Sequence, residues 1–294
     1  MLLPSLRPDV PAPKGPAPTA PAPKGPAPTV SVVLISVVLI SYNQERFVGP
    51  AVESVLAQTL AGWELLCVDD GSTDGTPDLL AAYAARDPRI RTLAHPNQGL
   101  SYTRNAGLHA ADLAGRAVLF LDGDDTLSPH ALETLLFHLA REPDAAAVVA
   151  RAEHIGPDGL PCEGRFPFPE PREGRKELSE MIERPWGMGM YPASIALYAR
   201  WAAEAAGGYN ASMRACEDDD FALRVALHGP FVFIPDVLTQ YRRHDSNVTN
   251  RQEFVECAYR QAVKRRPWYR RAWNAGRGAA LGRPVAPEDR IEAL

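Results

Sequence analysis

Short apolar runs alternate with helix-like segments through the first half of this 294-residue chain, and few folds accommodate that order. Strands separated by helices form βαβ units, whose strands lie parallel in one sheet. Helices cover both faces of such a sheet, so its strands are apolar without alternation. We therefore expect an α/β fold with a mostly parallel sheet. The expected strands are 36–40, 63–68, 89–94, 117–121, 145–150 and 231–234, and the expected helices are 52–60, 101–111, 128–141, one from 76 and one from 217.

A proline-rich repeat stands near the start of the chain. Its unit, Pro-Ala-Pro-Lys-Gly-Pro-Ala-Pro-Thr, occurs at 11–19 and again at 21–29. Proline lacks an N–H donor and favours an extended, polyproline II conformation. We expect residues 1–29 to form a disordered arm that is not part of the fold.

A second repeat follows directly. The unit Ser-Val-Val-Leu-Ile occurs at 31–35 and again at 36–40. Because the unit has an odd length, equivalent side chains of the two copies point to opposite faces of a strand. Only a strand buried on both faces tolerates this easily, which again favours a parallel sheet. We expect the second copy, which adjoins Ser41, to be the first strand of the fold.

The overall composition narrows the class of protein. A net charge of −5, with 46% apolar and 23% charged residues, is ordinary for a globular protein and argues against a general nucleic-acid binder. The four cysteines are widely spaced, so neither a disulfide framework nor a zinc site is expected. No apolar run reaches the ~18 residues that a membrane-spanning helix needs. These features predict a cytoplasmic protein.

The acidic run Asp122–Asp125 directly follows the apolar run 117–121. Clustered carboxylates repel one another and are costly to desolvate, so they need a cation or water. Ligands of open α/β sheets bind beyond the carboxyl ends of the strands. The position therefore suits a divalent metal and a phosphorylated ligand. The same residues would also suit a solvated acidic turn in which Gly123 makes the bend.

Two further polar motifs belong to the same half of the chain. Asp70 follows the strand 63–68 and could accept hydrogen bonds from a base or a ribose, or it could belong to an Asx-rich turn. Arg104 lies near an expected helix N-terminus, and both features suit a phosphate. The alternative for Arg104 is a surface ion pair.

The second half of the chain carries two more motifs. An expected helix begins with four consecutive acidic residues, Glu217–Asp220. The helix dipole favours acidic residues in a first turn, but four exceed what capping needs, so one of them is a candidate general base. Asp220 is expected to pair with Arg224 four residues later. His244 follows a strand and is flanked by arginine, so it could serve a metal or a pyrophosphate, although a lone histidine is usually structural.

In their order along the chain these motifs resemble the family 2 inverting glycosyltransferases of the GT-A fold. The resemblance runs from about Val30 to Thr249 and implies a nucleotide-sugar half at 30–126 and an acceptor half at 127–250. It also implies a nucleotide-sugar donor, with a UDP-sugar favoured, a divalent metal (Mn²⁺ or Mg²⁺), and a glycan or lipid-linked acceptor. The Gln-x-x-Arg-Trp motif of the processive members is not present, which favours transfer of single sugars in glycan, cell-envelope or glycolipid synthesis.

The resemblance gives each motif residue a role. The implied set is Tyr42 and Asp70 for the base, Arg104 for a phosphate, Asp122 for the ribose, Asp124 and His244 for the metal, and Asp218 with Glu217 for the acceptor. Asp218 would remove the proton from an acceptor hydroxyl that attacks the anomeric carbon from the face opposite the leaving group, which inverts the configuration. A solvated aspartate has a pKa of ~3.9, so we expect Asp218 to be ionised at neutral pH.

Two other interpretations remain open. Asp122 and Asp124 also fit the Asp-x-Asp-x-Thr motif of haloacid-dehalogenase-type phosphatases, as nucleophile and as acid/base. That fold usually carries the motif on its first strand and needs a downstream lysine, whereas here three strands precede it and only Lys176 and Lys264 follow. The second alternative is a nucleotide-sugar-binding domain without catalysis, against which the intact Asp124 and Asp218 argue.

The C-terminal segment 251–294 is basic, with nine Lys or Arg and two Glu between residues 251 and 283. We expect it to be helical in pieces. Within it, 262–275 mixes cations with aromatic residues, which suits an anionic membrane surface at the inner face of the plasma membrane. A solvated helical face would have the same composition.

Overall fold

The computed structural model divides the chain into two units, Met1–Ser31 and Val32–Leu294. It describes residues 34–110, 114–163, 173–176, 193–213 and 217–250, all of which belong to the second unit. The expected arm at 1–29 and the basic segment 251–294 lie outside the described residues. No helix in the described ranges is both long and apolar enough to cross a membrane.

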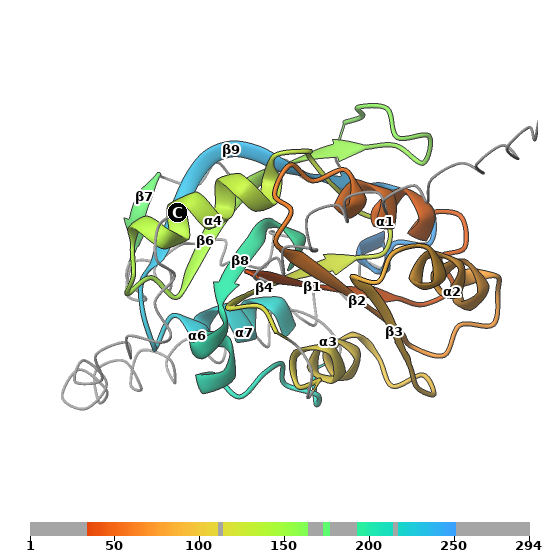
Figure 1. Cartoon of the computed structure of the whole chain (residues 1–294), viewed down its shortest axis with the longest axis horizontal. Helices are drawn as coiled ribbons and strands as arrows, with labels where there is room; N and C mark the ends of the chain where they lie inside the picture. The colour runs from red at the N-terminus through yellow and green to blue at the C-terminus, as the bar shows by residue number, and fades with distance from the viewer. Residues whose placement is uncertain (1–33, 111–113, 164–172, 177–192, 214–216, 251–294) are drawn as a thin grey trace, which may run out of the picture. The chain divides into compact units, whose positions relative to one another are not determined.

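The part of the chain that the structure describes forms a nine-stranded sheet in the order β3-β2-β1-β4-β8-β6-β9-β5, with β7 paired to β9 (Figure 1). The strands are β1 Ile35–Ser41, β2 Trp63–Asp69, β3 Ile90–Ala94, β4 Ala117–Asp122, β5 Thr126–Leu127, β6 Ala147–Ile155, β7 Gly174–Lys176, β8 Ala196–Ala199 and β9 Phe231–Arg242. The helices are α1 Val48–Leu56, α2 Thr76–Arg86, α3 Leu100–Leu108, α4 Ala131–Arg141, α6 Arg200–Ala205 and α7 Glu217–Val225, with short 3₁₀ turns at Ala193–Ile195 and Val248–Asn250. The predicted α/β class is confirmed.

Parallel pairing is concentrated in the first half of the sheet. Strands β3, β2, β1 and β4 are parallel neighbours, as βαβ units require. Strand β8 then enters antiparallel to both β4 and β6, and β5 and β7 pair antiparallel with β9. Among the described strands beyond β4, only β6 and β9 pair in parallel. The sheet is therefore mixed, and the expectation of parallel strands holds mainly for the half that carries the first motifs.

Helices cover both faces of the sheet. Helices α1, α2 and α4 lie on one side, and α3, α6 and α7 lie on the other (Figure 1). All seven residues of β1 and all seven of β2 are buried, which confirms the second copy of the five-residue repeat as a strand covered on both faces. Helix α3 lies close against β1, because a Cβ at Gly107 would overlap the Val38 side chain.

The buried carboxylate of Glu64 joins neighbouring strands near their N-terminal ends. Glu64 accepts hydrogen bonds from the Ser36 hydroxyl at 2.5 Å and from the Ala114 N–H at 2.6 Å, and it pairs with Arg91 at 3.0 Å. Its exposed fraction is 7%. Since a buried donor left without an acceptor is costly, this carboxylate stabilises the start of β1 and the entry to β4.

Replacing Glu64 with alanine is expected to lower the free energy of unfolding by about 2 kcal/mol, because the Ser36 hydroxyl and the Ala114 N–H lose their acceptor. Urea denaturation followed by circular dichroism measures the change. Glu53→Ala is the matched control, since Glu53 pairs with Arg86 on the surface and such pairs contribute about 0–1 kcal/mol. Equal losses in the two variants would contradict a structural role for the buried carboxylate.

The loop after β1 is fixed by a reciprocal set of hydrogen bonds to the loop after β2. The backbone N–H groups of residues 43–45 donate to side chains at the start of α2, and two side chains of the first loop accept in return. These bonds are Asn43 N–H to Ser72 Oγ (2.8 Å), Gln44 N–H to Thr76 Oγ1 (2.9 Å), Glu45 N–H to Asp74 Oδ2 (3.0 Å), Thr73 N–H to Asn43 Oδ1 (2.8 Å) and Gly75 N–H to Glu45 Oε2 (3.0 Å). Asn43 has a φ of 52°, a left-handed conformation that asparagine tolerates better than most residues.

Candidate active site

The carboxyl ends of the central strands bring together motifs that are far apart in the sequence. Asp122 ends β4, and Asp70 follows β2. Glu217 begins α7, and His244 follows β9. Arg104, on α3, connects two of these elements directly, because it binds carboxylates from both β4 and α7.

Arg104 is buried between two carboxylates. Its Nη2 lies 2.8 Å from Asp122 Oδ1 and its Nη1 lies 2.7 Å from Glu217 Oε1. The guanidinium carbon also lies 5.2 Å from the centre of the Tyr209 ring. Burial alone would lower the pKa of Arg104, but the charges of Asp122 and Glu217 raise it above its usual range. Arg104 therefore forms ion pairs, as the alternative interpretation of the sequence expected, but they are buried and not at the surface. Contact of Arg104 with a phosphate stays a prediction.

Asp125 holds the turn that presents the two aspartates before it. Its carboxylate is fully buried and accepts from the Arg242 N–H at 3.0 Å and from the Ser194 hydroxyl at 2.8 Å. Burial, and then the charges of Asp124 and Asp122, raise the pKa of Asp125 well above its usual range. Burial also raises the pKa of Asp122, while the Arg104 charge opposes that shift.

Asp124 faces His244 across the end of β9. Asp124 Oδ2 lies 3.0 Å from His244 Nε2, and the two side chains are 15% and 7% exposed. The Asn247 amide lies 3.4 Å from the same oxygen. A carboxylate oxygen and an imidazole nitrogen are both common ligands of divalent cations, so the side chains of Asp124 and His244 are a candidate pair of metal ligands.

This candidate pair would need further ligands to hold a cation. Within the described ranges, no group of three or more His, Cys, Asp or Glu side chains is arranged to hold a metal. Cations of nucleotide-dependent enzymes typically take one or two protein carboxylates and complete their shell with phosphate oxygens and water. Asp124 and His244 fit that mode, in which the ligand supplies the missing oxygens.

The carboxyl of Asp218 has a raised pKa. It is half-buried at the start of α7, and its Oδ1 accepts the Asp219 N–H at 2.9 Å. Burial of the carboxyl, followed by the charge of Glu217, raises the pKa of Asp218 to about 7. The expectation of a fully ionised, solvated aspartate was therefore wrong. A pKa near neutrality is the value that suits a general base.

Side chains that the sequence interpretation did not single out anchor α7. Asn105 binds both backbone groups of Tyr209, donating to its oxygen at 2.8 Å and accepting its N–H at 2.6 Å. The Tyr209 ring stacks on Phe221 of α7 with centroids 4.1 Å apart. Arg224 pairs with Asp220 at 2.9 Å, which confirms the expected structural pair. The Arg-Asn dipeptide at 104–105 was the available signal for Asn105, whereas Tyr209 had none beyond its neighbouring glycines.

Asp70 organises the loop before α3. Its carboxylate accepts the Gln98 N–H at 2.7 Å and the Gly99 N–H at 2.9 Å, and His95 Nδ1 lies 3.4 Å away. Tyr42, by contrast, is 46% exposed after β1. The roles of Asp70 and Tyr42 in base binding stay predictions.

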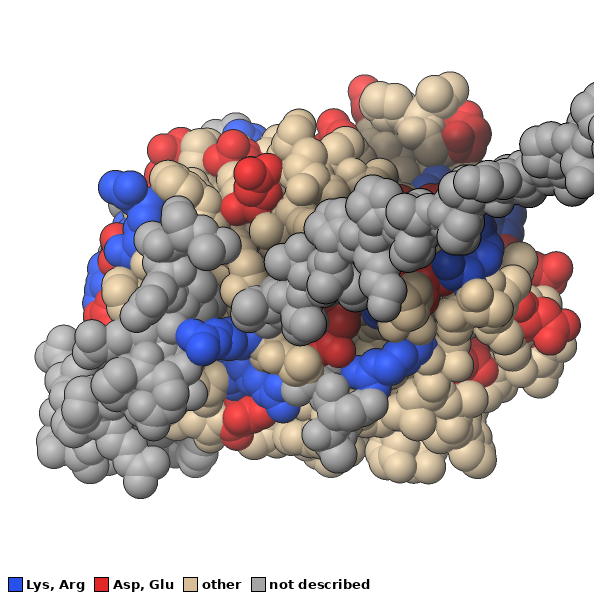
Figure 2. Space-filling view, in the orientation of Figure 1, with Lys and Arg blue, Asp and Glu red and all other residues tan. Residues whose placement is uncertain are grey.

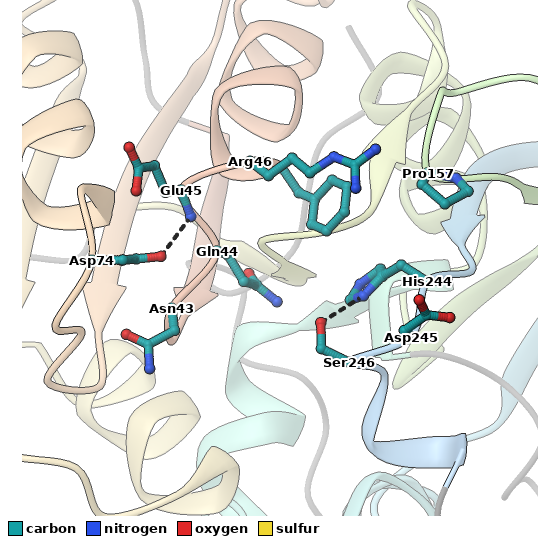
Figure 3. A pocket seen from close by; sticks show the side chains of 10 residues that line it. Asn43, Gln44, Glu45, Arg46, Asp74, Pro157, His244, Asp245 and Ser246 are labelled. Atoms are coloured by element: carbon teal, nitrogen blue, oxygen red, sulfur yellow. Dashed lines mark hydrogen bonds between the residues drawn. The ribbon is translucent and has the colours of Figure 1, made fainter.

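A cavity of about 670 Å³ opens beside His244 (Figure 3). The loop after β1 forms one wall and the segment after β9 forms the other. The lining residues are Asn43, Gln44, Glu45, Arg46, Phe47, Asp74, Pro157, His244, Asp245 and Ser246. Figure 2 shows acidic and basic side chains interspersed over the described part of the face that it draws.

Comparison with known proteins shows what this arrangement is similar to. The chain is 25% identical over 209 residues to a chondroitin synthase of Pasteurella multocida and 27% identical over 209 residues to one of Escherichia coli, which is 71% of this chain in each case. The match covers 20% and 29% of those relatives, so the chain spans less than a third of their length.

Solved structures share the fold. The S. aureus TarS 1-349 complex with UDP-GlcNAc superposes with a TM-score of 0.61 at 18% identity, over 74% of this chain and 61% of that one. The mannosyltransferase PcManGT of Pyrobaculum calidifontis, in complex with GDP-Man and Mn²⁺, gives a TM-score of 0.56 at 17% identity, over 86% and 76%. These likenesses identify the sheet and its helices as a GT-A fold.

The family itself is shown by the sequence. A family model described as glycosyl transferase family 2 matches residues 36–206, which is more than half of the chain. The match includes β1, β2 and β4 with the acidic residues that end β2 and β4, and it favours the glycosyltransferase interpretation of Asp122 and Asp124 over the phosphatase one. The chain belongs to glycosyl transferase family 2.

Proposed function

We propose that this protein transfers a sugar, with inversion, from a nucleotide-sugar donor to a hydroxyl of a glycan or lipid-linked acceptor, with the help of a divalent cation. One observation carries the proposal. Asp122 of β4 and Glu217 of α7 bind the same buried guanidinium of Arg104, which links the donor-side carboxylate Asp122 to the helix whose first turn carries the candidate base Asp218. Family membership supports the reaction class.

The first half of the domain, 30–126, is proposed to bind the donor, and 127–250 the acceptor. The TarS complex with UDP-GlcNAc and the PcManGT complex with GDP-Man support a nucleotide-sugar as the donor class. We favour a UDP-sugar. Asp70 and Tyr42 would contact the base, and Asp122 the ribose. Membrane contact through 262–275 and a cytoplasmic location also stay predictions.

The residues of this chain divide the chemical work. Asp218 accepts the proton of the attacking hydroxyl, which its pKa of about 7 allows at neutral pH. Glu217 helps to position the acceptor from a carboxylate that Arg104 holds in place. Asp124 and His244 would bind a divalent cation, which supplies positive charge against the departing diphosphate. Attack from the face opposite the diphosphate inverts the anomeric centre.

The cation site can be tested by calorimetry and thermal shift with UDP, GDP and their sugars, with and without Mn²⁺. Wild-type protein is expected to bind Mn²⁺ more tightly when a nucleoside diphosphate is present, because the two protein ligands need phosphate oxygens to complete the shell. A bound ligand also raises the melting temperature of the native state. Asp124→Ala should remove this mutual enhancement.

Asp236→Ala is the matched control, since it removes the same charge from an exposed position of β9. An unchanged dependence of nucleotide affinity on Mn²⁺ in Asp124→Ala would contradict the assignment. A wild-type protein that binds donor and cation but transfers no sugar to any acceptor would favour the alternative of a binding domain without catalysis.

A further inference from the structure

His244 is held on three sides. Its ring stacks on Phe47, with centroids 4.4 Å apart and an interplanar angle of 28°. Its Nδ1 lies 2.8 Å from Ser246 Oγ, and its Nε2 lies 3.0 Å from Asp124 Oδ2 and 3.2 Å from the Asn247 amide nitrogen. Figure 3 shows Ser246 beside the His244 ring, joined to it by this hydrogen bond. The plane of the ring and the directions of both nitrogens are therefore fixed.

Phe47 occupies a place that core packing does not explain. It is 7% exposed, yet it is not a member of the main apolar cluster of the described residues. Its neighbours are instead cations and an imidazole, since the guanidinium carbons of Arg46 and Arg242 lie 5.2 and 5.4 Å from its ring centre. Because Phe47 directly precedes α1 and His244 follows β9, this stacking joins two distant parts of the chain.

The Ser246 hydroxyl can form a hydrogen bond with Nδ1 in either tautomer of His244, because a hydroxyl both donates and accepts. When a neutral ring donates from Nε2 to Asp124, Nδ1 carries a lone pair and the serine hydroxyl donates to it. When Nε2 binds a cation, its lone pair must be free, so the proton sits on Nδ1 and the hydroxyl oxygen accepts it. The proton moves between ring nitrogens through water, without net uptake or release. A backbone carbonyl could serve only the second state.

We propose that Phe47 and Ser246 are positioning residues for His244. Phe47 fixes the plane of the imidazole, and Ser246 keeps a hydrogen bond to Nδ1 while the tautomer changes as a cation enters or leaves. The inference rests on the proposed cation site at Asp124 and His244. Phe47 lies outside the sequence motifs that predicted the site.

The tautomer can be read directly by long-range ¹H–¹⁵N NMR of histidine side chains in the full chain. His244→Gln assigns the signal. In metal-free wild-type protein the Nε2–H tautomer is expected, and addition of UDP with diamagnetic Mg²⁺ is expected to shift the population to Nδ1–H. Ser246→Ala should broaden or mix the tautomers in the metal-free state, while Ser246→Thr, which keeps the hydroxyl, should preserve the wild-type pattern. Identical spectra for Ser246→Ala and wild-type would overturn the role of Ser246.

The effect on cation binding is measured by calorimetric titration of Mn²⁺ into the protein with UDP. Loss of a residue that orients a metal ligand typically weakens metal affinity by about 10–100-fold, so Phe47→Leu and Ser246→Ala are each expected to weaken Mn²⁺ binding by about tenfold or more. Phe47→Tyr keeps an aromatic ring and should bind as wild-type does. Phe137→Leu is the matched control, since Phe137 also contacts a histidine ring but is 56% exposed on α4.

The outcomes separate the inference from the function on which it rests. If wild-type protein shows no UDP-dependent Mn²⁺ binding, the cation site and the inference both fail. If wild-type binds Mn²⁺ and Phe47→Leu binds it equally well while folded, only the positioning role of Phe47 is overturned. Ser246 is exposed, so Ser246→Ala keeps the test valid even where Phe47→Leu is unstable.

Discussion

Replacing Asp218 with asparagine is expected to lower the turnover number by about 10²–10⁴, the range that general-base catalysis contributes. The amide keeps the shape of the carboxyl and can still accept the Asp219 N–H, so α7 should remain intact. Initial rates of sugar transfer measure the loss, and calorimetry should show that donor and Mn²⁺ still bind. Asp78→Asn, at an acid in the first turn of α2, is the control.

The same residue predicts a pH dependence with a defined sign. Only the ionised carboxylate accepts a proton, so kcat/KM should rise with pH as Asp218 ionises, with an apparent pKa of about 7 in the free enzyme. The pKa of Asp218 is higher in the native state than in the unfolded chain, so the native state keeps this proton to a higher pH. Asp218 therefore lowers the free energy of unfolding as pH rises from about 4 to 7. Turnover that is retained in Asp218→Asn, or a flat profile across neutral pH, would remove Asp218 as the base.

Replacing Arg104 with alanine is expected to lower the free energy of unfolding by about 3–5 kcal/mol, because the buried Glu217 and the half-buried Asp122 would lose their counterion. Arg104→Lys should recover only part of the loss, since an ammonium cannot reproduce the two-pronged contact of a guanidinium. Urea denaturation at neutral pH measures both variants. Donor binding and transfer should also fall, because Asp122 and α7 lose their shared anchor.

Arg175 provides a matched control for this prediction. It also binds two carboxylates, Glu142 at 3.1 Å and Asp144 at 2.6 Å, but all three side chains are at least 40% exposed. Arg175→Ala should therefore cost about 1 kcal/mol or less. The difference between Arg104→Ala and wild-type should also shrink at low pH, because the raised pKa of Asp122 lets protonation remove its charge there. Equal losses at the two arginines would show that burial adds nothing to the pair.

Local patterns were enough to predict most strands of the first half. The runs 36–40, 63–68 and 117–121 each became a strand within about one residue, because parallel strands buried on both faces are apolar throughout. The strand expected at 231–234 was too short. Strand β9 continues to Arg242 through three exposed residues, since β6 keeps pairing with it across a shift in register near Arg151. No local apolar pattern marks that continuation.

The members of the site were predictable, but their contacts were not. Arg104 could be interpreted as a phosphate ligand or a surface ion pair, because nothing near it in the sequence reveals that α7 arrives from 113 residues away. Burial is also a property of the folded chain, which is why the pKa of Asp218 was misjudged from its reference value. Phe47 resembled any other apolar residue before a helix, and only the position of His244 gives it a role.

The duplicated five-residue unit gives this fold a competing register. If β1 slipped by one unit, Ser31 would replace Ser36 beside Glu64, and the strand itself would be unchanged in character. The slip would instead change the loop after β1, where Val38 and Ile40 would replace Asn43 and Glu45. Valine could not accept the Thr73 N–H and would be strained at a φ of 52°, and isoleucine could not accept the Gly75 N–H. The loop beside the candidate active site therefore also selects which copy of the repeat folds, so a substitution there could populate a misthreaded sheet without touching the core.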